Sequence, residues 1–394
     1  MRYLQQWKSM MNKSGFLFYL DGMGTGGIAK VYIALAEVLL QRGVPVGFIV
    51  AENRVELSFP SGAWFRVNKD ANSGCIGMAH KYIGDSLLFL EAAVADFEFE
   101  FGSATILVAG DRVPVVARNL NHSAIFNSAH ITRAGLSKWP GVLGRVRLCF
   151  KLWRRSHLLR FILDERPLHC VSEGLARELM GLFGVKPSMQ SVIYNPFDIA
   201  AIRQQACKST PESIAQEKPF IVGVGRFVRS KHFERLVVAF SRSKFDGDLV
   251  LIGQGEDEGF LRSEIARLGL QSRVKIVHFH ENHHALVSKA KLLVSTSSAE
   301  GFGNTIVESL IVGVPALSLD CPHGPREIIE PLCPDAVVPV NQIARLPELI
   351  DRFVDSPYVI RDDCLRRFDA EHIADQYLAL AEKIQLMHGE KIDI

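Results

Sequence analysis

Two glutamates, Glu300 and Glu308, stand eight positions apart around a turn that contains two glycines. The apolar run at residues 291–295 predicts a buried strand before this turn. Residues 304–312 predict a helix after it, which Gly313 ends. Glu300 is therefore expected at the carboxyl end of a strand and Glu308 about one turn inside a helix. Carboxylates placed in this way can accept hydrogen bonds from the hydroxyls of a ligand.

The start of this helix offers a second kind of contact. Unpaired N–H groups at a helix start, together with the helix dipole, favour phosphate. Because a carboxylate fits poorly beside phosphate, we expect Glu308 to hold the two hydroxyls of a ribose. The pattern thus predicts a nucleotide diphosphate joined to a polyhydroxylated group, and solvated glutamates are the alternative. The residues expected around this ligand are Gly301, Phe302, Gly303, Asn304, Thr305 and Ile306.

Two cations, Arg226 and Lys231, follow a predicted strand at residues 220–224. The guanidinium can bind two oxygens at once and the ammonium acts as a point charge. Such a pair is suited to clamp a diphosphate and to stabilise the charge that grows on a departing phosphate. A pair of solvated surface cations is the alternative, and Arg229 is a further candidate.

These motifs resemble the donor site of retaining GT-B glycosyltransferases of the family 4 type. The resemblance rests on E-x7-E at residues 300–308, on G-R-x4-K at 225–231, and on the run D-C-P-H-G-P-R-E-I at 320–328. The last run is similar to a bacterial surface-polysaccharide and lipopolysaccharide branch of that family. The resemblance implies that the glutamates bracket a nucleotide-sugar, with UDP favoured as the nucleotide. No D-x-D motif lies in the expected place, so we expect neither a metal ion nor another cofactor.

The same resemblance implies roles for two glycine turns and one histidine. Gly26 and Gly27 follow a predicted strand and precede a helix, and Gly253 follows another strand, so all three are expected near the donor. Tight structural turns are the alternative at these positions. His130 is implied near the reacting sugar; His122 is its competitor, and a merely structural histidine is the alternative.

Four histidines, at positions 278, 280, 283 and 284, have a spacing that invites a metal site. A junction between a strand and a loop gives them no obvious convergent geometry, and Glu281 is the one carboxylate within the segment. We therefore do not predict a metal site here. The resembled family often has glycine near His278, so this segment departs from the family pattern.

Short apolar runs alternate with helical patterns along both halves of the chain, which predicts two parallel sheets. We predict an α/β protein of GT-B type, in which two Rossmann-like domains face each other across a cleft and bind ligands at the carboxyl ends of their strands. Residues 1–199, with a C-terminal helix at 370–394, are expected to bind the acceptor. Residues 217–369 are expected to bind the donor. Residues 53–81 are left unassigned.

Composition sets the expected surroundings of the chain. Its 394 residues suit two domains. Residues 1–199 hold 22 Lys+Arg against 16 Asp+Glu, and residues 200–394 hold 23 against 27, so the first half is expected to meet an anionic partner. Seven cysteines without a C-x-x-C pair favour reduced thiols in the cytoplasm. Neither a signal peptide nor a run of about 18 apolar residues is seen, so we expect a cytoplasmic protein, peripheral on the inner face of the membrane.

Residues 112–163 contain ten Lys or Arg and no Asp or Glu. Within them a predicted helix carries aromatics on the side away from its cations, as suits an anionic membrane surface or an acidic glycolipid acceptor. The alternative is a solvated helix that packs its apolar side on the domain core. Nucleic acid is not expected, because no binding motif accompanies the patch. The patch residues are Arg145, Arg147, Lys151, Arg154 and Arg155.

The sequence thus predicts a retaining hexosyl- or N-acetylhexosaminyltransferase. It would act on a lipid-linked glycan, lipopolysaccharide or capsule acceptor, with Glu300, His130, Arg226 and Lys231 as catalytic residues. One alternative is a non-catalytic nucleotide-sugar-binding scaffold at the membrane. Another is a different GT-B sugar enzyme, such as an epimerase or a phosphorylase. No oligomeric state is assigned.

Overall fold

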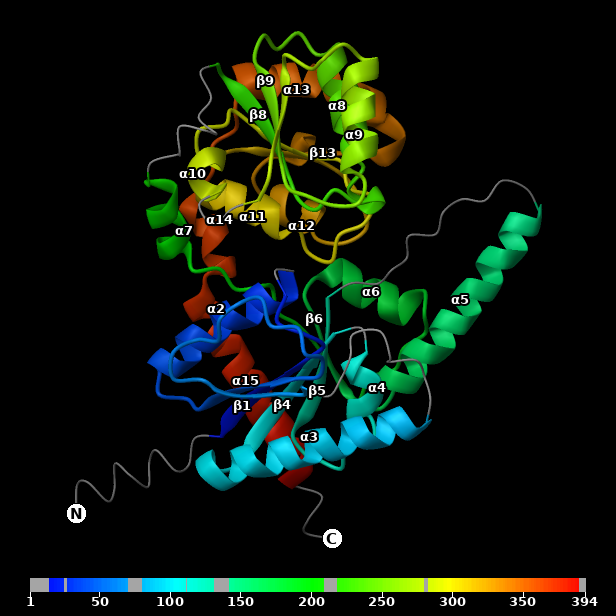
Figure 1. Cartoon of the computed structure of the whole chain (residues 1–394), viewed down its shortest axis with the longest axis vertical. Helices are drawn as coiled ribbons and strands as arrows, with labels where there is room; N and C mark the ends of the chain where they lie inside the picture. Colours follow the sequence, from blue (N-terminus) through cyan, green and yellow to red (C-terminus); the bar gives the residue numbers. More distant parts are fainter. Residues whose placement is uncertain are drawn as a thin grey trace.

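The chain folds into two α/β domains, each built on one parallel sheet (Figure 1). The computed structural model describes residues 14–24, 27–69, 80–110, 112–130, 142–208, 218–279 and 283–389, and only the backbone of 80–82, 142–147 and 388–389. In Figure 1 the second domain lies above the first along the long axis. The predicted fold class is confirmed.

The first sheet has seven strands in the order β3-β2-β1-β4-β5-β6-β7. Most of its central strands are fully buried apolar runs, as a sheet covered by helices on both faces requires. The sequence did not predict β3, whose half-exposed residues lack both a continuous apolar run and a clear alternation. The strands are β1 (Gly15–Leu20), β2 (Val46–Val50), β3 (Trp64–Val67), β4 (Ala104–Ala109), β5 (Ile125–Ala129), β6 (Pro167–Cys170) and β7 (Met189–Val192).

The second sheet has six strands in the order β10-β9-β8-β11-β12-β13. In both sheets the strand order reverses, between β1 and β4 in the first and between β8 and β11 in the second. Ligands of open parallel sheets bind outside the carboxyl ends of strands at such a reversal. The strands are β8 (Phe220–Val224), β9 (Asp248–Ile252), β10 (Val274–Val277), β11 (Leu293–Ser295), β12 (Ala316–Leu319) and β13 (Val337–Val338).

Helices cover both faces of each sheet and complete the cores. In the first domain they are α2 (Gly27–Gln41), α3 (His80–Phe101), α4 (Val113–Ala117), α5 (Val142–Leu163) and α6 (Glu173–Gly181). From the link to the second domain onward they are α7 (Ile199–Ala206), α8 (Phe233–Arg242), α9 (Glu258–Arg267), α10 (His283–Val287), α11 (Asn304–Ile311), α12 (Pro325–Ile329), α13 (Leu346–Asp355), α14 (Asp362–Leu365) and α15 (Ala370–Gly389). Short 3-10 turns are η2 (Arg229–Lys231), η3 (Pro334–Ala336), η4 (Val340–Arg345) and η5 (Arg366–Phe368).

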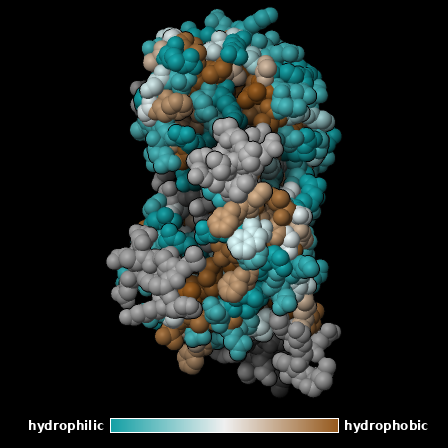
Figure 2. Space-filling view, turned by 90° about the vertical axis from the view of Figure 1, so that its right-hand side faces the viewer, coloured by the Kyte–Doolittle hydropathy of each residue, from teal (hydrophilic) through white to brown (hydrophobic). Residues whose placement is uncertain are grey.

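Helix α5 projects away from the first domain (Figure 1). Phe150 and Trp153 on this helix are 57% and 56% exposed, so their rings do not pack on the domain core. The alternative interpretation, in which the apolar side of the helix packs on the core, therefore does not hold for these two rings. Figure 2 views the molecule from the side toward which α5 projects in Figure 1, and it shows hydrophobic side chains at the surface of the first domain. No helix among the described residues is long and apolar enough to span a membrane.

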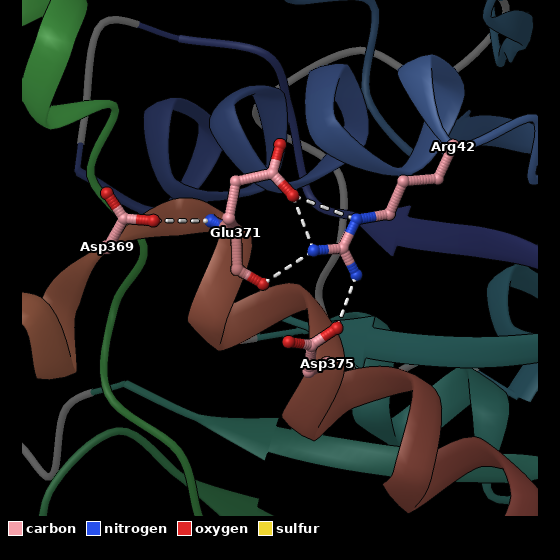
Figure 3. Close-up of polar contacts among 4 residues, drawn as sticks. All are labelled: Arg42, Asp369, Glu371 and Asp375. Atoms are coloured by element: carbon pink, nitrogen blue, oxygen red, sulfur yellow. Dashed lines mark hydrogen bonds and ion pairs between the residues drawn. The ribbon is translucent and has the colours of Figure 1, made fainter.

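The last helix, α15, leaves the second domain and packs on the first sheet beside α2 (Figure 1). Arg42, at the end of α2, donates hydrogen bonds to the Glu371 carboxylate and backbone carbonyl and lies 2.6 Å from Asp375 Oδ1 (Figure 3). Asp369 accepts a hydrogen bond from the backbone N–H of Glu371 at 3.0 Å and so holds the start of α15. The chain therefore crosses between the domains a second time.

Candidate functional site

The first glutamate of E-x7-E is paired with the lysine of G-R-x4-K. Lys231 Nζ lies 2.5 Å from Glu300 Oε1, and Ser297 Oγ donates to the same oxygen at 2.6 Å. Lys231 ends η2, which follows β8, while Glu300 follows β11. These two strands flank the reversal of strand order in the second sheet. Two residues that are 69 positions apart thus meet where a nucleotide is expected to bind.

Arg226, the other cation of G-R-x4-K, is exposed at the carboxyl end of β8. Within the part of the chain that the structure describes, its guanidinium makes no hydrogen bond or ion pair, unlike Lys231. The sequence predicted a clamp made of both cations. In the structure only Lys231 is held, whereas Arg226 keeps all of its donors for a ligand.

Two glycines allow the motif loops to pack on each other. A Cβ on Gly324, which has φ +74°, would lie 1.6 Å from the carbonyl oxygen of Phe302, so the run at 320–328 is pressed against the E-x7-E turn. A Cβ on Gly253 would lie 1.9 Å from the carbonyl oxygen of Gly225. No side chain fits either place. Gly253 therefore shapes the loop of G-R-x4-K, whether or not it also touches a donor.

Phe302 is buried, although the sequence placed it around the donor. Its ring packs against those of Tyr194 and Phe368, with centroids 5.2 and 5.7 Å away. The side chain therefore anchors the turn at the junction of the two domains, and the backbone is the part of this residue that remains for a ligand.

The start of α11 faces the first domain. Asn304 accepts a hydrogen bond from Asn195 Nδ2 at 2.7 Å, and a Cβ on Gly27, at the start of α2, would lie 3.3 Å from Asn304 Nδ2. Gly26 lies outside the described residues. The sequence predicts unpaired N–H groups at the start of this helix, but the N–H of Ile306 donates to the carbonyl of Gly303 at 3.0 Å, because the helix begins with a tight turn. Among the described residues, the N–H groups of Asn304 and Thr305 remain unpaired.

The second glutamate, Glu308, faces two histidines that start α10. Its Oε2 lies 3.7 Å from His283 Nε2 and 3.8 Å from His284 Nε2. Burial raises the pKa of Glu308, but the two imidazoles outweigh burial and hold its pKa at about 2. Burial lowers the pKa of His283. At neutral pH Glu308 is thus an anion beside an uncharged His283.

His130 is buried at the carboxyl end of β5, inside a hydrogen-bonded group of polar side chains. Its Nε2 lies 2.6 Å from Tyr32 Oη and 3.2 Å from Ser128 Oγ, and Ser128 Oγ lies 2.7 Å from His169 Nδ1. This geometry orients His130 from within the domain. The sequence did not predict Tyr32 and His169 as members of this group, because they lie on α2 and β6. His122 is instead paired with Glu98, at 3.1 Å.

We expect the protein to lose stability in acid because His130 and His169 are buried as neutral imidazoles. Burial lowers their pKa values to about 3 and about 4, against about 6.5 in an unfolded chain. Below pH 6.5 the unfolded chain takes up protons that the folded chain does not. The free energy of unfolding should therefore fall by about 5 kcal/mol between pH 6.5 and pH 4, as measured by urea denaturation.

The control for this pH effect is an exposed histidine. His169→Gln should flatten the fall with pH, whereas His372→Asn, on the surface of α15, should leave it unchanged. Equal slopes in His169→Gln and in the parent chain would show that other groups govern acid unfolding.

Four contacts join the E-x7-E turn and the loop at 320–328 to α6 of the first domain, and the sequence did not predict them. Ser172 Oγ, which caps α6, donates to the carbonyl of Gly301 at 3.0 Å. The Glu327 carboxylate accepts the N–H groups at positions 173 and 174 at 3.0 and 2.7 Å. His323 Nε2 lies 3.0 Å from the carboxylate of Glu178. Ser172 is recognisable from sequence as a helix cap. The contacts themselves join residues 129 or more positions apart, so no local sequence pattern indicates them.

The basic patch on α5 is only partly as predicted. Lys151 and Arg154 are exposed, but Arg155 is half-buried, with its guanidinium 5.7 Å from the ring of Phe183. The side chains of Arg145 and Arg147 lie outside the described part of the chain.

The two domains have the GT-B architecture of glycosyltransferases. The Anabaena protein HepE, solved in complex with UDP and glucose, has a TM-score of 0.70 at 18% identity, over 94% of this chain and 99% of that one. Residues 207–368 match the model of the family Glycosyl transferases group 1.

Two curated relatives share part of the sequence. The N-acetylgalactosamine-N,N'-diacetylbacillosaminyl-diphospho-undecaprenol 4-alpha-N-acetylgalactosaminyltransferase of Campylobacter jejuni is 31% identical over 157 residues, 40% of this chain. The lipopolysaccharide 1,6-galactosyltransferase of Escherichia coli is 27% identical over 188 residues, 47% of this chain. The matches span 42% and 51% of the lengths of these relatives.

Proposed function

We propose that this protein is a retaining glycosyltransferase that moves a hexose or N-acetylhexosamine from a UDP-sugar to a lipid-linked glycan, lipopolysaccharide or capsule acceptor. The proposal is carried by the pairing of Lys231 with Glu300 at the strand-order reversal of the domain that matches the family model. The UDP and glucose named for the Anabaena structure and the acceptors named for the two relatives support the choice of substrates.

Each motif has a role in donor binding. Arg226 and Lys231 bind the diphosphate, and the free N–H groups of Asn304 and Thr305 bind its distal phosphate. Glu308 accepts hydrogen bonds from the ribose hydroxyls. Lys231 already lies against Glu300, so a bound donor would place its phosphate beside the ammonium and its sugar hydroxyls beside the carboxylate.

The transfer step needs no protein nucleophile. The bond between the anomeric carbon and the β-phosphate oxygen breaks, and a bond from the same carbon to the acceptor oxygen forms on the same face of the sugar. The acceptor proton passes to the departing phosphate oxygen. Arg226 and Lys231 stabilise the negative charge that develops on that phosphate. His130, held by Tyr32, would orient the reacting sugar from the first domain, and no metal ion is assigned to this step.

The acceptor is assigned to the first domain and the membrane surface. Exposed aromatic rings at Phe150 and Trp153 lie next to the exposed cations Lys151 and Arg154 on α5. A helix that carries both kinds of side chain suits the boundary between anionic headgroups and acyl chains. We propose a peripheral position on the inner face of the cytoplasmic membrane.

Calorimetric titration of UDP, GDP and ADP without metal tests the donor site. One nucleotide, expected to be UDP, should bind the parent chain, and Arg226→Ala should weaken it by about 10- to 100-fold, the effect of losing a charge-assisted hydrogen-bond donor. Arg229→Ala is the matched control, because Arg229 is exposed on the same loop but stands outside the motif. Equal losses of UDP affinity in both variants would show that the overall positive charge of the loop, and not Arg226 itself, is responsible. No binding to folded protein would favour the scaffold alternative.

A further inference from the structure

The strongest unexplained feature of the molecule is the group formed by His283, His284 and Glu308. Both histidines are buried, at 5% and 8% exposure, although they belong to a residue type that usually keeps contact with water. One nitrogen from each imidazole and one carboxylate oxygen of Glu308 all lie within 4.8 Å of one another. The histidines come from α10 and the glutamate from α11, so the two helices fix the group from two sides.

The hydrogen bonds of this group are incomplete. His284 Nδ1 lies 2.8 Å from Oε1 of Gln205 on α7 and donates its proton to that amide oxygen. His284 Nε2 is buried without a hydrogen-bond partner and lies 3.8 Å from the carboxylate of Glu308. At that distance neither atom is hydrogen-bonded to the other, and both can be ligands of one cation.

No protein cation fills that place within the described residues. The nearby Lys30 places its ammonium 4.5 Å from the ring centre of Phe279, which in turn packs on His283 at 4.4 Å. Lys30 is therefore directed at the aromatic face.

We infer that His283, His284 and Glu308 form a site for a divalent transition-metal ion of the Zn²⁺ type. Two imidazoles and one carboxylate are the ligand set of zinc sites that keep an open fourth position. Gln205 acts as the outer partner that orients one imidazole. Tetrahedral ligands at about 2.0–2.2 Å from zinc lie roughly 3.3–3.6 Å apart. The two nitrogen–oxygen distances are 3.7 and 3.8 Å and no pair of ligand atoms is more than 4.8 Å apart, so the three side chains must draw together around the ion.

This ion would regulate donor binding, a consequence that rests on the proposed function. Glu308 is proposed to accept hydrogen bonds from the two ribose hydroxyls. A metal ion bound to its carboxylate oxygens would prevent them from accepting those hydrogen bonds. Zinc and UDP should therefore exclude each other, and zinc should inhibit the enzyme. The existence of the ion site is independent of what the nucleotide does.

Calorimetric titration with Zn²⁺, in the absence of nucleotide, tests the ion site directly. One ion per chain should bind, and His284→Gln and Glu308→Gln should each weaken that binding by at least 10-fold, as loss of a ligand does. His278→Gln is the matched control, because His278 is an exposed histidine of the same segment beside Glu258. The visible absorption of Co²⁺ in place of zinc should show a tetrahedral site that disappears in His284→Gln.

Two outcomes would overturn the site: no binding of Zn²⁺ to folded protein, or binding that His284→Gln and Glu308→Gln leave unchanged. The competition is tested by titrating UDP with and without Zn²⁺. The apparent affinity for UDP should fall with zinc in the parent chain and not in His284→Gln. Unchanged UDP affinity beside a confirmed ion would overturn the regulatory part. Failure of UDP to bind at all would overturn the proposed donor site, while the zinc titration would still decide the ion site.

Discussion

Replacing Lys231 with alanine is expected to lower kcat for sugar transfer by about 100- to 1000-fold, the usual cost of removing one group that stabilises developing charge. Lys231 Nζ lies 2.5 Å from Glu300 Oε1, so the substitution removes the proposed phosphate ligand and also leaves the carboxylate without its cation. The Glu300 side chain is 12% exposed, so water screens the uncompensated charge poorly. Initial rates with a UDP-sugar and an acceptor would measure the loss.

The control for Lys231→Ala is Lys289→Ala, an exposed lysine of the same domain. A double substitution with Glu300→Gln sharpens the test, because two residues that act as one unit give non-additive losses. Losses that add would show that the pair does not work together. A rise in KM at unchanged kcat would limit Lys231 to ground-state binding of the donor.

The secondary structure around each site motif could be predicted from sequence because each motif is a run of consecutive residues. The strand, turn and helix around Glu300 and Glu308 follow from an apolar run, two glycines and a helical period. The same holds for Arg226 and Lys231 after β8. In each case the side chains directly follow a strand of a parallel sheet. They therefore lie at the edge formed by the carboxyl ends of the strands, and their position in the sequence is enough to predict this placement.

The long-range part of the site could not be predicted in the same way. Nothing in the spacing of His283 and His284 shows that α10 turns both rings toward Glu308, whose contacts with them cross 24 and 25 positions. Within the histidine segment Glu281 is the one carboxylate, whereas Glu308 lies on the following helix and is brought to the histidines by the fold. Likewise, Tyr32 reaches His130 across 98 positions, through packing of α2 on the sheet.

The second domain depends on the first for the shape of its E-x7-E turn. Ser172 holds the carbonyl of Gly301, and the ring of Phe302 is packed between Tyr194 and Phe368. Residues on both sides of the domain junction therefore fix the turn that precedes α11. A substitution that displaces this turn should affect folding and donor binding together.

Gly324→Ala is the substitution that tests this coupling most directly. The new Cβ would lie 1.6 Å from the carbonyl oxygen of Phe302, and φ +74° is strained for alanine. Because backbone on both sides must shift, we expect a loss of about 3 kcal/mol in the free energy of unfolding. The UDP affinity should fall as well, since Phe302 leads into the turn before Asn304. Thermal unfolding and calorimetry with UDP would measure both effects.

Gly313→Ala separates strain from collision. Gly313 has φ +84° at the end of α11, but a Cβ there would meet no atom within 4 Å. Its replacement by alanine should lower the free energy of unfolding by about 1 kcal/mol, because alanine must adopt a left-handed backbone conformation there. UDP binding should be unchanged. Equal losses of stability in the two variants would mean that the loops at Gly324 and Phe302 separate freely. In that case the contact between the two motifs would not be what holds the donor turn in place.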